Sequence, residues 1–135
     1  NSTGFINPNG GGVYQGNNST TWSQTSDIRI KKNVVDNDTG LDKINQIQVR
    51  NFEYKTEEEI KVDNPELKDV VSSVVVDKEG TQLGVIAQEI ETILPAAVKT
   101  EDTGVKSVDP DNLTWYLVNA VKELSARVQE LESRQ

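Results

Sequence analysis

Ser26 and Lys31 are the two side chains whose types and spacing could do covalent chemistry. The sequence contains no His and no Cys, which excludes imidazole bases, thiol nucleophiles and the triads built on them. A serine hydroxyl beside a lysine amine remains the leading pair of nucleophile and base. The two residues are five positions apart, which puts them on opposite faces of a strand and roughly 140° apart on a helix. They therefore meet only if the segment turns, or if Lys31 reaches Ser26 of another chain.

Asp27 and Arg29 stand between these two residues and are candidates for a supporting role. Asp27 could orient the lysine amine or oppose the loss of its proton, whereas Arg29 and the neighbouring Lys32 could favour that loss. A Ser-Asp pair is also a common turn or cap, and a basic cluster is usually solvated, so spacing alone leaves both interpretations open. With no His or Cys and no metal-loop signature among the carboxylates, we expect no metal and no cofactor.

A sharp change in composition separates residues 1–25 from residues 26–135. No Asp, Glu, Lys or Arg occurs before residue 26. The first segment is rich in Gly, Asn, Ser and Thr, with scattered aromatic and aliphatic residues between turn signals. This composition favours the end of a β-rich stalk whose core forms between chains, over a flexible linker. The boundary predicts two domains, 1–25 and 26–135.

Short elements are predicted between this boundary and residue 110. The β-branched run at 70–76 predicts a strand, which would form a hairpin with residues 83–86 across a turn at 77–80. We expect the 55–80 region to protrude as an arm that contacts the stalk. The other predictions are a strand or extended segment at 26–35, a short helix at 41–47, a strand at 49–54, a helix at 87–94, and a turn at 102–104 that is flanked by Val98 and by Val105 to Val108.

Residues 111–135 form the longest periodic stretch and predict a C-terminal helix. Asp109 suits the N-cap and Pro110 the first helical position. Apolar residues then recur at spacings of 4, 3, 4 and 3, which is a heptad seam with Val at a and Leu at d. An amphipathic helix packed on its own domain would show the same pattern, and these a and d residues nominally favour dimers. The members of the seam are Leu117, Val121, Leu124, Val128 and Leu131.

The charge balance excludes two classes of partner. The 135 residues include 14 basic and 22 acidic side chains, which gives a net charge of −8. This argues against binding to nucleic acid or to an anionic membrane surface, and no apolar run approaches the roughly 20 residues of a membrane span. Only 34% of the residues are hydrophobic, so a monomer would have a thin core. We expect oligomerisation to supply part of the burial.

The motif Ser26-Asp27-x-Arg29-x-Lys31 resembles the opening of the intramolecular chaperone of endosialidase family, the self-cleaving C-terminal modules of phage tailspikes, tail fibres and neck appendages. The resemblance covers about residues 26 to 135, and Pro110 departs from it, because members often have an aromatic residue there. Further matches follow in chain order at Leu41 to Ile47, Phe52-Glu53-Tyr54, Gly84 to Glu89, Leu94-Pro95, and Lys106 to Asp109 before a helix with Leu113, Leu117 and Ala120.

The resemblance implies a homotrimer that folds its own fibre stalk and then releases itself by autoproteolysis. The implied scissile bond is Thr25–Ser26, which falls on the charge boundary. The Ser26 hydroxyl would attack the Thr25 carbonyl carbon while Lys31 takes the proton, and water would hydrolyse the resulting ester. If the burial of Lys31 is completed only when the trimer closes, cleavage would report correct assembly. The parent would be a virion tail or appendage precursor made in the host cytoplasm.

The sequence thus predicts an α+β protein. A small globular part with strands and a hairpin would carry a long C-terminal helix in a trimeric bundle, and the end of a β-structured stalk would precede it. Two other functions are open. A non-catalytic trimerisation module would explain the seam and the acidic charge, but not the motif at the composition boundary. A receptor-binding fibre tip would need exposed aromatic residues within 26–135, where they are few.

Overall fold

The computed structural model describes residues 13–14 and 23–135. By internal contacts the chain divides into two units, Asn1–Asn37 and Asp38–Gln135. In the first unit, β1 (Val13–Tyr14) pairs antiparallel with β2 (Ser23–Gln24), and one turn of 3-10 helix, η1 (Ile28–Ile30), follows. Most of the predicted stalk end, residues 1–25, lies outside the described residues.

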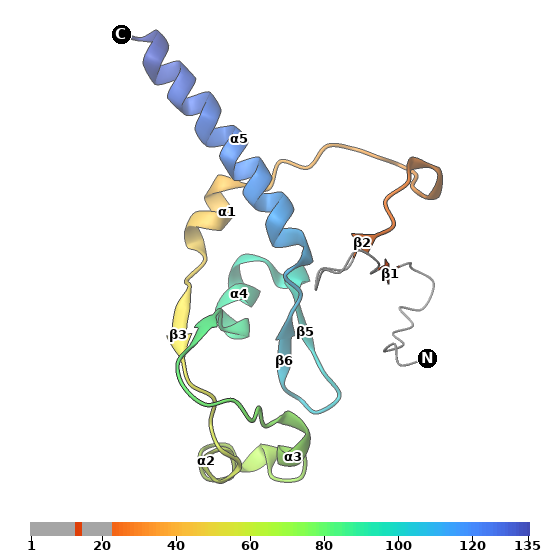
Figure 1. Cartoon of the computed structure of the whole chain (residues 1–135), viewed down its shortest axis with the longest axis vertical. Coiled ribbons are helices and arrows are strands. Elements are labelled where there is room, and N and C mark those ends of the chain that lie inside the picture. The colour runs from red at the N-terminus through yellow and green to blue at the C-terminus, as the bar shows by residue number, and fades with distance from the viewer. Residues whose placement is uncertain (1–12, 15–22) are drawn as a thin grey trace. The chain divides into compact units, whose positions relative to one another are not determined.

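The second unit is an α+β arrangement of short elements and one long helix, as predicted (Figure 1). The structure confirms the short helix near 41–47, the helix near 87–94, the turn at 102–104 and the long C-terminal helix, and it adds a strand on each side of that turn. The corresponding elements are α1 (Leu41–Gln46), α4 (Ala87–Ile93), β5 (Val98–Thr100), β6 (Lys106–Val108) and α5 (Asp111–Ser133). Strands β5 and β6 pair antiparallel, with Lys99 opposite Ser107.

The largest buried cluster is centred on α4 and the residue that follows it. Ile90, Ile93 and Leu94 recur at i, i+3 and i+4, so they share one side of the helix, and Ile90 is completely buried. This one short helix therefore collects apolar contacts from β5, β6, the start of α5 and the residues that follow α1 and β4. The partly buried side chains packed on it are Ile47, Val85, Ala97, Val98, Val108, Leu113 and Tyr116.

The predicted strand at 70–76 is wrong. These residues contain a one-turn helix, α3 (Val71–Val74), which follows α2 (Glu57–Asp63) and η2 (Pro65–Leu67). Strand β4 (Gln82–Gly84) pairs instead with β3 (Arg50–Phe52), the strand expected near 49–54. Val71 is buried in this arrangement, and burial outweighs the weak intrinsic preference of valine for strands. The 55–80 region is thus a helical connection between two paired strands (Figure 1).

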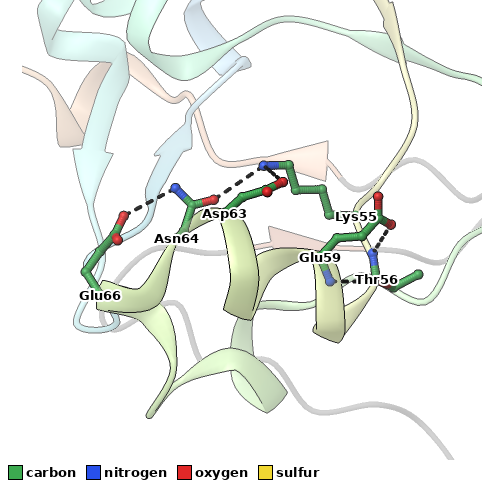
Figure 2. A network of polar contacts seen from close by, with 6 residues as sticks. All are labelled: Lys55, Thr56, Glu59, Asp63, Asn64 and Glu66. Carbon is green, nitrogen blue, oxygen red and sulfur yellow. Dashed lines mark hydrogen bonds and ion pairs between the residues drawn. The ribbon is translucent and has the colours of Figure 1, made fainter.

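Polar side chains fix both ends of α2 (Figure 2). At its start, Glu59 N donates to Thr56 Oγ1 at 3.2 Å and Thr56 N donates to Glu59 Oε1 at 3.1 Å, which is a capping box. At its end, Lys55 Nζ lies 3.1 Å from Asp63 Oδ2 and donates to Asn64 Oδ1 at 3.4 Å. A helix of seven residues is unstable alone, so these contacts help to hold its shape.

Helix α5 begins at Asp111, the start of the predicted range 111–135, but its N-cap is not Asp109 as predicted. Pro110 occupies the N-cap, and Asp109 Oδ1 accepts a hydrogen bond from Asp111 N at 2.9 Å. Asp109 therefore still satisfies a free N–H group at the start of the helix. Neither α5 nor any other helix in the described part of the chain is long and apolar enough to cross a membrane.

Gly40 allows the start of α1 to lie close to α5. A Cβ atom on Gly40 would lie 3.0 Å from Asn119 Cβ and 3.1 Å from the backbone nitrogen of Ala120. Ala120 is only 3% exposed, and Asn119 Nδ2 donates to the Thr39 carbonyl oxygen at 2.8 Å. One side of α5 is thus occupied by the protein's own α1, which leaves the other sides for contacts of another kind.

We predict that Gly40→Ala destabilises the second unit by about 1–3 kcal/mol, because the new methyl group overpacks this contact. Urea unfolding followed by circular dichroism measures the effect. The atom nearest to the new methyl group would be Glu123 Oε1, at 2.5 Å, which stands at the end of a flexible side chain. If the contact with the Ala120 backbone causes the destabilisation, Gly40→Ala remains destabilising in a Glu123→Ala background. Full recovery in that background would contradict this explanation.

Candidate functional site

A single turn of 3-10 helix reverses the direction of the chain between Ser26 and Lys31. Ile30 N donates to the Asp27 carbonyl at 3.1 Å, and Lys31 N donates to the Ile28 carbonyl at 3.1 Å. Asp27 and Lys31 on either side have extended backbone angles. The prediction of a strand or extended segment at 26–35 is therefore wrong at 28–30. These residues form a helical turn because the Asp27 side chain caps it.

The turn brings the two candidate catalytic side chains together in one chain. Lys31 Nζ lies 2.6 Å from Ser26 Oγ and donates a hydrogen bond to it. Neither a strand nor an α-helix would allow this contact at a spacing of five. When the amine is neutral, its lone pair can accept the serine proton over the same distance. The arrangement suits activation of a serine hydroxyl by an adjacent base.

Asp27 and Arg29 form a pair beside this contact. The Arg29 guanidinium holds the Asp27 carboxylate with two bonds, Nε to Oδ1 at 3.0 Å and Nη2 to Oδ2 at 2.7 Å. Asp27 Oδ1 also accepts from Arg29 N at 2.8 Å, which caps the 3-10 turn. The sequence suggested that Asp27 could orient or oppose the lysine amine, but the structure directs its carboxylate to Arg29.

Hydrogen bonds within this pair shift both ionisation equilibria. The Arg29 side chain, followed by its backbone N–H, lowers the pKa of Asp27, and Asp27 in turn raises the pKa of Arg29. Both groups therefore stay charged in the range where a lysine amine loses its proton. The side chains of the motif are exposed in the single chain, including Ile28 at 68% and Ile30 at 67%. The single chain thus does not bury Lys31.

The lowered pKa of Asp27 predicts a specific acid response of the clamp. A carboxylate whose pKa falls on folding contributes stability above its ordinary pKa of about 3.9, and loses it as the pH drops through the lower folded value. We expect the Asp27 side-chain carboxyl carbon to titrate below about pH 3.9 in an NMR experiment. In Arg29→Gln the midpoint should rise towards the ordinary value. Equal midpoints in the two proteins would contradict the pairing.

The five seam residues of α5 form a continuous exposed stripe. Leu117, Val121, Leu124, Val128 and Leu131 are between 46% and 63% exposed. Their own domain packs on other residues of the helix, such as Ala120 and Tyr116. The alternative that the periodicity reflects packing on the same domain thus does not hold for these five side chains. Their contact with a second helix stays a prediction.

A hollow on this stripe was missed in the sequence. It is lined mainly by apolar surface of Thr114, Leu117, Val118 and Val121, with Lys122 at its side. The first four recur at i, i+3, i+4 and i+7, which is the four-residue hole of knobs-into-holes packing. The predicted seam consists only of heptad positions a and d, and it therefore includes Leu117 and Val121 of this hollow. Val118 follows Leu117 at position e, and this apolar e residue is the sequence signal that could have revealed the hollow.

Neither part of the candidate site includes a metal centre. Among the described residues, no group of three or more His, Cys, Asp or Glu side chains is placed to hold a metal ion.

Comparison with known proteins relates the chain to a peptidase family and to phage tail fibre proteins. Residues 26–99 match the model of a peptidase family described as chaperone of endosialidase. The chain is also 33% identical over 113 residues to the long tail fiber protein Gp37 of Enterobacteria phage K3, and equally so to Gp37 of Enterobacteria phage T2. These alignments cover 81% of this chain but only 8% and 7% of the two fibre proteins. The chain thus corresponds to a small part of such a fibre.

Proposed function

Because the chain belongs to the chaperone of endosialidase family, we propose that it is the C-terminal chaperone module of a phage tail fibre or tailspike. It brings three copies into register and then cuts itself off between Thr25 and Ser26. The observation that carries this proposal is the 2.6 Å hydrogen bond between Lys31 and Ser26, the first residue of the family match. In this account residues 1–25 are the end of the stalk, 26–135 the chaperone, and 111–135 its C-terminal helix.

The cutting step is an acyl shift followed by hydrolysis. Neutral Lys31 removes the hydroxyl proton as Ser26 Oγ attacks the carbonyl carbon of Thr25. The bond from that carbon to Ser26 N breaks, and Lys31 returns the proton to the amine, which leaves an ester between Thr25 and Ser26 Oγ. Water then hydrolyses the ester to the Thr25 carboxylic acid and the free hydroxyl. The proposed reaction steps use no metal ion or other cofactor.

The assembly step depends on the exposed stripe of α5. In a parallel coiled coil, a hole made by residues at a, d, e and the next a accepts a d residue of the partner. The hollow of Thr114, Leu117, Val118 and Val121 has this order, so it suits Leu117 of a neighbouring copy. Bundled helices would raise the effective concentration of the attached stalk ends to about millimolar. They would also set register before slow, non-local β pairing begins.

The family, rather than the seam, supports three copies. Val at a and Leu at d nominally favour two strands, but this seam is short, and the rest of each chain also contributes to assembly. The helical 55–80 region is the part that we propose to contact the stalk. Val62 on α2 is 77% exposed there and offers an apolar contact. The module would act in a virion tail or appendage precursor made in the host cytoplasm and would be released after the cut.

Assembly and cutting are coupled in this account through burial. Ser26 and Lys31 are already in contact but exposed, and a lysine must be neutral to act as a base. Ile28 and Ile30 lie between them in the chain and are also exposed. Covering these apolar side chains during trimer closure would remove water from the amine and favour its neutral form. Cleavage would then report a correctly closed trimer.

The proposed activity predicts the products of the folded protein. Intact mass spectrometry of the freshly folded wild type should show fragments 1–25 and 26–135, because all the reacting groups belong to the chain. Ser26→Ala and Lys31→Ala should stay whole, since each lacks one partner of the dyad. A wild type that stays whole as a stable trimer would favour the non-catalytic trimerisation module instead.

The coupling predicts that breaking the seam also slows cleavage. Leu124→Asp places a charge in the apolar stripe and should convert trimers to monomers in analytical ultracentrifugation, with cleavage at least about 10-fold slower. Ala126→Asp adds the same carboxylate two residues away on the same helix, off the seam, and should leave both properties unchanged. A monomeric Leu124→Asp protein that cuts at the wild-type rate would rule out the coupling.

A further inference from the structure

Asp27 and Arg29 have no contact with the reacting hydroxyl or amine, yet they carry the densest group of hydrogen bonds in the motif. Three bonds join these two residues, at 2.7, 2.8 and 3.0 Å. One of them caps the turn, and the other two hold the guanidinium across the carboxylate. The Asp27 carboxylate is thus engaged with Arg29, while Ser26 and Lys31 bond to each other.

We propose that Asp27 and Arg29 are a positioning pair, whose clamp holds the 3-10 turn that keeps Lys31 against Ser26 of the same chain. This inference rests on the proposed self-cleavage and assigns these two residues a role in it. They act through the backbone of the turn and do not take or give protons in the reaction.

The turn needs such a clamp because little else holds it. Its backbone contributes only two hydrogen bonds of the i to i+3 type, whose geometry is poorer than that of an α-helix. The side chains of Ile28 and Ile30 are exposed and give it no core. Without the cap and the guanidinium, the segment would sample extended conformations, in which a spacing of five separates the hydroxyl from the amine.

The clamp also resolves an electrostatic conflict within the motif. A free carboxylate next to the dyad would stabilise the protonated lysine and so oppose its use as a base. Two-point pairing with Arg29 compensates the negative charge of Asp27 locally. A lysine in place of Arg29 would keep the positive charge but lose the planar fork that fits a carboxylate.

Cleavage kinetics of the full chain test the role in the reaction. We expect Asp27→Asn, Arg29→Gln and Arg29→Lys each to slow cleavage by about 10- to 100-fold, because a small misplacement of the base has effects of this size. The double variant Asp27→Asn/Arg29→Gln should be no slower than the slower single variant, because the two residues act as one unit. Lys99→Gln, which removes an exposed positive charge outside the motif, should cut at the wild-type rate.

The pH profile separates positioning from a direct effect on the amine. If the pair only positions Lys31, the double variant Asp27→Asn/Arg29→Gln, which removes both charges together, lowers the maximal rate but leaves the pH midpoint of the rate unchanged. A shifted midpoint in this double variant would mean that Asp27 or Arg29 acts on the charge of the lysine, and it would overturn the proposal. Wild-type rates in Asp27→Asn and Arg29→Gln would overturn it as well.

NMR of the same full-length proteins tests the geometry without relying on cleavage. At pH 5, we expect a nuclear Overhauser effect between Ser26 Hβ and Lys31 Hε in the wild type, and its loss in Asp27→Asn and Arg29→Gln, with the signals of α5 unchanged. Persistence of the effect in these variants would overturn the positioning role. A wild type that shows the effect but never cuts would contradict the proposed self-cleavage and still support the clamp.

Discussion

The hydrogen bond between Lys31 Nζ and Ser26 Oγ is the interaction on which the proposed activity depends. It exists because the chain reverses over one 3-10 turn, and the turn is capped by Asp27. In either regular secondary structure, the two side chains would point apart. In the proposed mechanism, a segment of six residues, Ser26 to Lys31, therefore supplies the nucleophile, the base and the pair that would align them. Such a segment would equip a protein without His or Cys for acyl chemistry.

In a single chain, this segment is exposed to solvent. The dyad and its flanking isoleucines are exposed, and so is the stripe on α5. Exposed apolar side chains at both places are typical of a surface that a partner covers. A second copy of the chain suits the stripe on α5, because the hollow and the leucine that would fill it, Leu117, belong to the same helix. In the proposed function, the local turn geometry would align the reacting groups, and association of chains would supply the burial that favours the neutral amine.

The sequence predicted elements well where the signal was local and periodic. The long helix from Asp111 and the short helix from Leu41 followed from the spacing of their apolar residues. It failed where a distant contact decided the outcome: β3 pairs with a strand that follows the whole 55–80 connection, and Val71 is helical because it is buried there. Residue types singled out Ser26 and Lys31, but the turn that joins them depends on the Asp27 and Arg29 contacts, which the pattern of apolar residues does not encode.

The most direct test of a dyad formed within one chain is co-refolding of Ser26→Ala chains with Lys31→Ala chains, followed by intact mass spectrometry of the mixed trimers. In these mixtures no chain has both side chains, but a serine and a lysine from different chains can meet. The account predicts that all chains stay whole, while wild-type chains folded in parallel are cut. Cleavage of the Lys31→Ala chains in the mixture would show that a lysine from a neighbouring chain serves as the base, and it would contradict the central claim.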